Sequence, residues 1–216
     1  MNGWAPYLAA WAVFLLSHAI PVRPWIKGWL VARLGAGGFG LAYSAVSVAA
    51  LAWLIVAAGR APWVPLWDAA AWQRAFAQGA TLAACLLIAF AAFAPNPLSF
   101  AGWRNARFEP DRPGIVGLLR HPFLAALVLW AAGHVPANGD LAHALMFGGF
   151  AAFAALGMAM IDRRRRRELG TADWARLTSG RITLPPAWPV RLAAGLGLWW
   201  VLAALHPILI GPAVWP

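Results

Sequence analysis

Residues 120–140 read RHPFLAALVLWAAGHVPANGD and combine a long apolar run with two histidines and a polar end. An apolar run of this length is typical of a helix that crosses a membrane, which needs about 20 residues to span about 30 Å of hydrocarbon. Ala137-Asn138-Gly139 predicts a tight turn after the run, and Asp140 is expected to cap the following helix. The stretch therefore predicts a membrane helix and a second helix that returns antiparallel to it.

The composition extends this prediction to the whole chain. Of its 216 residues, 62% are hydrophobic and 11% are charged, whereas a soluble domain is about half apolar and about a quarter charged. So many apolar residues do not fit inside one small core, which indicates an integral membrane protein. The length suits a single domain over residues 1–216. The single cysteine, Cys85, excludes an internal disulfide and a multi-cysteine metal site.

We expect an all-α fold, a polytopic membrane helix bundle with about six transmembrane helices. Helices are expected because a segment in lipid must satisfy its own backbone hydrogen bonds. The apolar segments lie at about residues 4–20, 38–58, 75–94, 114–137, 141–161 and 190–211.

The basic residues predict the orientation of this bundle. Fifteen of the 17 lysines and arginines fall after the first, third and fifth segments, and only Arg60 and Arg74 fall on the other side. The positive-inside rule then predicts a multi-pass protein of the bacterial inner membrane with both termini in the periplasm. The arginine run at residues 163–167 is explained as a topology determinant that also contacts anionic lipid headgroups. Nucleic-acid binding is not expected, because no soluble domain carries the basic residues.

The five histidines are the candidate ligands of a metal or haem iron, because ionisable groups within membrane segments often serve a function and neutral imidazole binds iron well. The alternative is that each one only donates a hydrogen bond between helices. His121 and His134 are about 20 Å apart along a continuous helix, so they cannot bind one iron together. The predicted orientation places His134, His143 and His206 near the outer face of the membrane and His18 near the cytoplasmic face. By depth in the membrane, His134 would therefore pair with His206 or His143.

Several motifs together resemble the NnrU family of bacterial membrane proteins. These are RHP…W…H…NGD at residues 120–140, SHAIP at 17–21, IDRRRRRELGTADWARL at 161–177 and Leu205-His206-Pro207. The resemblance covers almost the whole chain. The family name carries a link to nitrite and nitric oxide reduction in denitrifying bacteria, which implies a role connected with that process.

The related 15-cis-zeta-carotene isomerase of plants and cyanobacteria is a membrane protein with haem b that isomerises a double bond when its iron is reduced. The resemblance implies His18 and His134 as axial ligands of the haem iron, a pairing that conflicts with the expected depths of the two residues. A cysteine that serves there as an alternative ligand is replaced here by Ala131. The side chains expected to wall a porphyrin, from their spacing to the two histidines, are Trp11, Phe14 and Trp130.

Two other functions are open from the sequence. The Arg120-His121-Pro122 motif and the segment LGTADWARL…LPP are similar to isoprenylcysteine-type membrane methyltransferases, and the charge pattern places a set of polar residues on one membrane face. That set is Arg120, His121, Asp162, Glu168 and Trp174. The remaining possibility is a non-catalytic accessory protein. The expected partners are the lipid bilayer and either a redox partner or a lipophilic small molecule.

Overall fold

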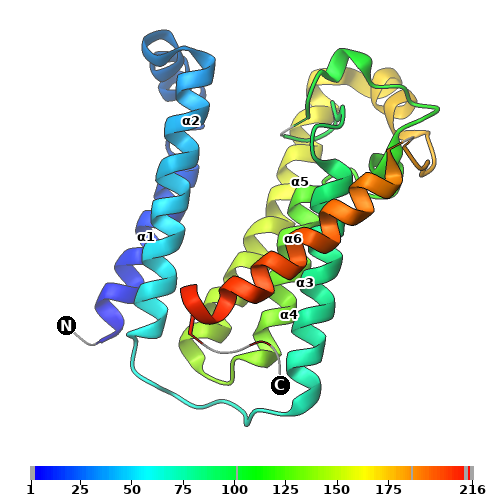
Figure 1. Cartoon of the computed structure of the whole chain (residues 1–216). Helices are drawn as coiled ribbons and strands as arrows, with labels where there is room; N and C mark the ends of the chain where they lie inside the picture. The colour runs from blue at the N-terminus through cyan, green and yellow to red at the C-terminus, as the bar shows by residue number, and fades with distance from the viewer. Residues whose placement is uncertain (1–2, 101, 186, 212–213, 215–216) are drawn as a thin grey trace. The chain divides into compact units, whose positions relative to one another are not determined.

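The computed structural model describes residues 3–100, 102–185, 187–211 and 214. Within these residues the chain forms six α-helices and two short 3₁₀ helices, which confirms the all-α fold class (Figure 1). The elements in chain order are α1 (Trp4–Ala19), α2 (Pro24–Gly59), α3 (Ala71–Ala91), η1 (Asn105–Arg107), η2 (Gly114–Gly117), α4 (Pro122–Ala137), α5 (Leu141–Thr178) and α6 (Trp188–Leu209).

Four of the helices, α2, α3, α5 and α6, are long and apolar enough to cross a membrane, and α4 is a shorter apolar helix. Many large apolar side chains on their surfaces are open to the surroundings; Leu41 and Ile208, for example, are 76% and 77% exposed. A soluble protein rarely exposes apolar surface on this scale, so lipid is the solvent for these faces. The chain is therefore a multi-pass membrane protein.

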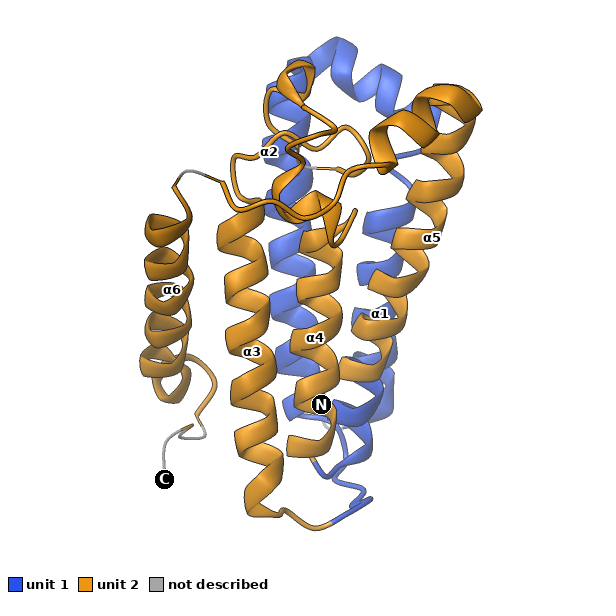
Figure 2. Ribbon diagram, turned by 90° about the vertical axis from the view of Figure 1, so that its right-hand side faces the viewer, with its two compact units in different colours: residues 1–67, 139–146 blue, residues 68–138, 147–216 orange. Residues whose placement is uncertain are grey.

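The chain divides into two compact units (Figure 2). The first contains residues 1–67 and 139–146, and the second contains residues 68–138 and 147–216. In the first unit α1 packs against α2. The Tyr7 hydroxyl, on a side chain that is 1% exposed, donates a 2.8 Å hydrogen bond to the carbonyl of Ala142, and the backbone N–H of Leu66 donates to the carbonyl of Gly139.

Helix α2 differs from the prediction at its N-terminal end. The residues expected to form a loop with Arg23, Lys27 and Arg33 are largely helical, because α2 begins at Pro24. Proline fits the first turn of a helix well. Gly35, at φ 71° and ψ 165°, interrupts the helix before the apolar segment, a conformation that favours glycine because it has no Cβ.

In the second unit α3 lies between α4 and α6 (Figure 2). Glycines allow the close approach of the helices: a Cβ at Gly133 of α4 would lie 2.5 Å from Ala80 Cβ of α3. A Cβ at Gly195 of α6 would lie 2.8 Å from a methyl carbon of Leu86. Small residues of this kind are typical of helix interfaces in membranes, where close van der Waals packing drives association.

Helices α4 and α5 form the predicted antiparallel hairpin. Trp130 of α4 contacts the rings of Phe147 and Phe150 of α5, and farther along Gly157 approaches Leu124. Asp140 caps α5 as predicted, since its carboxylate accepts a hydrogen bond from the backbone N–H of His143.

Two helix boundaries differ from the expected ones. The fourth apolar segment was expected from residue 114, but α4 begins at Pro122 and has 16 residues. A residue before proline is pushed out of the helical conformation, and His121 accordingly has φ −121° and ψ 63°. Helix α5, in contrast, extends beyond the apolar segment to Thr178, with a break at Gly170, where φ is 76°.

We predict that Gly133→Ala destabilises the second unit by about 1–3 kcal/mol, because the added methyl group meets Ala80 and forces α3 and α4 apart. The measurement is the thermal midpoint for loss of monodisperse protein in detergent. Gly79→Ala, on α3, is the matched control, since nothing lies within 4 Å of a Cβ at that position. Equal midpoints for the two variants would contradict the close-packing explanation.

Candidate functional site

His134 lies near the C-terminal end of α4 with one ring nitrogen fixed by the backbone. Its Nδ1 is 2.7 Å from the carbonyl oxygen of Trp130, one turn earlier. A carbonyl only accepts, so Nδ1 carries the proton and the lone pair of the neutral ring is on Nε2. This is the tautomer that an Nε2 metal ligand requires, held by the backbone bond that commonly orients such ligands. The ring lies 5.1 Å from that of Trp130 and 4.9 Å from that of Phe147, centre to centre.

His18 shows the same local arrangement in the first unit. Its Nδ1 is 2.7 Å from the carbonyl oxygen of Phe14, again one turn earlier in the helix. Its ring lies 4.4 Å from the ring of Phe14 and 5.9 Å from the ring of Tyr43 on α2. Two of the predicted porphyrin walls, Phe14 and Trp130, are therefore direct neighbours of the histidines with which the sequence associated them.

His206 and His143, the other two histidines that the sequence predicts near the outer face, differ in their surroundings. His206 lies in the last turn of α6 and belongs to the same unit as His134. His143 is bound to the cap of its own helix, with Nδ1 2.8 Å from the Asp140 carboxylate. This contact gives His143 a structural role at the start of α5.

A polar cluster lies at the opposite end of α4. The guanidinium of Arg120 makes two hydrogen bonds to the Asp162 carboxylate, at 3.2 and 2.7 Å. His121, which is 4% exposed, has Nε2 2.9 Å from Asp162 and Nδ1 2.9 Å from the Ser99 hydroxyl. Both ring nitrogens therefore have protein partners. We refer to Ser99, Arg120, His121 and Asp162 as the Asp162 cluster.

The loop between α3 and α4 lies next to the Asp162 cluster and contacts both the start of α4 and the end of α5. Asn96, which is 5% exposed, donates from its side chain to the carbonyl of Arg120 and accepts from the backbone N–H of Leu98. After the break at Gly170, the end of α5 turns and packs on this loop. The apolar contacts there are among Leu98, Phe108, Ile115, Val116, Leu169, Trp174 and Leu177.

The sequence placed Arg120, His121, Asp162 and Trp174 on one face, and the structure brings them together. Trp174 lies against the guanidinium of Arg120, 5.8 Å from the ring centre to Cζ. Glu168 instead pairs with Arg164 and Arg165. Sequence reasoning missed Asn96 and Ser99. Asn96 stands between two prolines, which is typical of a break after a helix, but no pattern identified Ser99 as a partner of His121.

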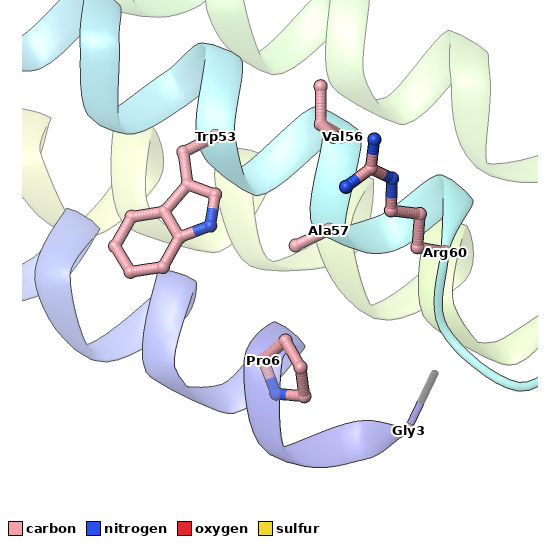
Figure 3. A pocket seen from close by; sticks show the side chains of 6 residues that line it. All are labelled: Gly3, Pro6, Trp53, Val56, Ala57 and Arg60. Carbon is pink, nitrogen blue, oxygen red and sulfur yellow. The ribbon is translucent and has the colours of Figure 1, made fainter. Parts of the chain in front are cut away.

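A shallow hollow of about 300 Å³ lies in the first unit between the start of α1 and the end of α2 (Figure 3). Its walls include Trp53, Val56 and Pro6, with Arg60 beside them. The hollow is at the opposite end of α1 from His18, and none of its lining residues is a candidate iron ligand. Among the described residues there is also no group of three or more His, Cys, Asp or Glu side chains that could hold a metal ion.

The sequence matches the family model described as NnrU protein over residues 7–214. The chain belongs to the NnrU family. No curated protein and no solved structure matches the sequence. The family match covers both units, including the histidines of α1, α4 and α6 and the Asp162 cluster. The predicted membership in this family is therefore confirmed over nearly the whole chain.

The contacts within the Asp162 cluster shift the pKa values of Asp162 and Arg120. Asp162 lies beyond the apolar part of α5, which ends at residue 161. Partial burial by itself raises the pKa of this carboxyl, but the hydrogen bonds and positive charge of Arg120, together with His121, outweigh burial and lower its pKa below the ordinary value. The same carboxylate raises the pKa of Arg120.

We predict that Asp162→Asn lowers the stability of the protein by about 1–2 kcal/mol at neutral pH, because it removes a charged acceptor shared by two side chains. A carboxyl whose pKa is lowered by folding stabilises the protein above its unfolded pKa, about 3.9, and this contribution is lost as the pH falls through the folded value. Thermal midpoints in detergent from pH 7 to pH 3 test this. The difference between wild type and variant should shrink below about pH 4; a constant difference would contradict the assignment.

Proposed function

We propose that this NnrU-family membrane protein binds haem b, with His134 as one axial ligand of the iron. The observation that carries the proposal is the backbone hydrogen bond from Nδ1 of His134 to Trp130, which fixes the ring and leaves the lone pair on Nε2. The rings of Trp130 and Phe147 beside it supply the apolar aromatic surroundings that a porphyrin requires. Haem would provide an iron centre that changes oxidation state and binds small ligands.

His18 is our choice for the second axial ligand. The resemblance to the haem-containing isomerase implies this residue. Its Nδ1 makes the same kind of backbone hydrogen bond as that of His134, here to the carbonyl of Phe14. His206 is the alternative, since it belongs to the same unit as His134 and is expected at a similar depth in the membrane. His121 is less suited to bind iron, because both of its nitrogens are bonded in the Asp162 cluster.

The proposed role is redox-dependent and connected with nitrite and nitric oxide reduction, as the family name suggests. Isomerisation of a lipophilic polyene is the second possible use of the same haem site. Ala131, at the position of the cysteine ligand of the isomerase, is fully buried. The thiolate that exchanges with histidine in that enzyme therefore has no counterpart at this position, which favours the first role.

We also propose that the end of the second unit with the Asp162 cluster faces the cytoplasm. The arginines of the α3–α4 loop and of the polar part of α5 gather at this end, and Arg191 at the start of α6 donates to three carbonyls at the end of α3, at 2.8–3.0 Å. The positive-inside rule then supports a cytoplasmic location for this end and a periplasmic location for both termini in the bacterial inner membrane.

Purified protein from haem-replete cells tests the haem proposal. We expect a Soret band that shifts when dithionite reduces the iron. His134→Ala should lose the band, because it removes the ligand that the backbone has oriented, and His18→Ala should shift or weaken it. The measurement is the ratio of Soret to protein absorbance in a monodisperse detergent fraction.

His143→Ala is the matched control, since this histidine is held by Asp140 and is not expected to bind iron. His206→Ala distinguishes the two possible second ligands. A colourless wild-type preparation would overturn the haem proposal. A Soret band that persists unchanged in His134→Ala would contradict the assignment of His134 as an iron ligand.

A further inference from the structure

The five consecutive arginines of α5 divide into two groups. Arg164 and Arg165 both pair with the Glu168 carboxylate, at 3.4 and 2.9 Å. Arg163, Arg166 and Arg167 are spaced as i, i+3 and i+4, so they project from one side of the helix. Among the described residues no carboxylate lies within ion-pair distance of these three. We refer to Arg163, Arg166 and Arg167 as the arginine face.

An aromatic ring holds one member of the arginine face in place. The break at Gly170 turns the chain, and Trp174 comes to lie with its ring centre 4.9 Å from Cζ of Arg166. Trp174 itself is half-buried against the apolar contacts of the α3–α4 loop. A cation over an indole ring is attracted by the ring and loses part of its conformational freedom. Arg166 is therefore oriented before any ligand binds.

The charges around this tryptophan are not balanced. Arg120 also lies against the Trp174 ring, but its charge is compensated by Asp162. Arg166 and its two neighbours have no such compensation. Three uncompensated guanidinium groups within two helical turns repel one another, and an anion between them relieves the repulsion. Guanidinium groups bind phosphate through paired N–H donors, which makes phosphate the anion that fits best.

The position of the arginine face along α5 identifies the source of the phosphate. The apolar part of α5, residues 141–161, is about 31 Å long at about 1.5 Å per residue, the thickness of the hydrocarbon layer. The arginine face begins two residues later, at the level of lipid headgroups. Tryptophan is also enriched at this level. We propose that Arg163, Arg166 and Arg167, ordered by Trp174, bind the phosphate of an anionic phospholipid headgroup.

Lipid binding to the full-length protein in detergent tests this proposal. Native mass spectrometry would compare the adducts formed with phosphatidylglycerol and with zwitterionic phosphatidylcholine at equal concentrations. Arg163→Gln/Arg166→Gln should weaken phosphatidylglycerol binding by about 10- to 30-fold, because each arginine near an anionic lipid contributes roughly a factor of five. Arg163→Lys/Arg166→Lys should lose less, since the charge remains while the paired donors are removed.

Arg164→Gln/Arg165→Gln is the matched control, because it removes the same number of charges from the side already paired with Glu168. It should change binding by less than about twofold. Equal losses in the two glutamine variants would show that only net charge matters and would overturn the proposal. Equal binding of the two lipids by the wild type would also overturn it. So would displacement of phosphatidylglycerol by millimolar inorganic phosphate, which would indicate a site for a soluble anion.

Discussion

The carboxylate of Asp162 joins three separate parts of the second unit. It accepts hydrogen bonds from Arg120 and His121, which stand immediately before α4, while it belongs to α5 itself. His121 in turn forms a hydrogen bond with the hydroxyl of Ser99 in the loop after α3. A charge removed from water costs free energy unless other groups stabilise it, and here a guanidinium and an imidazole do so. The loop, the start of α4 and the polar end of α5 are thus fixed relative to one another.

Within the apolar layer a different constraint applies. Helices in lipid gain little from burying apolar surface against each other, since the lipid is equally apolar, and they associate through close packing. Gly133 and Gly195 permit this close packing on both sides of α3. Arg191 adds a polar contact at the end of the same helix, because its guanidinium donates to the carbonyls of Ala89, Phe90 and Ala92 that the helix leaves unpaired. Helix α3 is therefore the centre of the second unit.

The histidines fall into two physical groups. His121 and His143 bond to carboxylates: His121 joins the start of α4 to Asp162 of α5, and His143 bonds to Asp140 at the start of its own helix. His18 and His134 bond through Nδ1 to a backbone carbonyl one turn earlier, which fixes the orientation of each ring. The second arrangement directs the Nδ1 proton to the backbone carbonyl and leaves Nε2 as the nitrogen that would bind a metal. This difference is the physical basis for treating His18 and His134, and not His121, as the proposed ligands of haem iron.

The sequence by itself determined the all-α membrane fold, the α4–α5 hairpin, the cap at Asp140 and the family, because these depend on apolar length, local turn residues and motifs. It did not determine where α4 begins, since residues 115–119 are mostly apolar and were expected in the same helix. Pro122 and the polar contacts of His121 exclude them from it. It also could not show that Ser99 and Asn96 meet the residues around Arg120. Those contacts join segments more than 20 residues apart, and tertiary packing alone decides such pairings. The orientation of the His18 and His134 rings depends on backbone carbonyls, and the sequence pattern does not show such contacts.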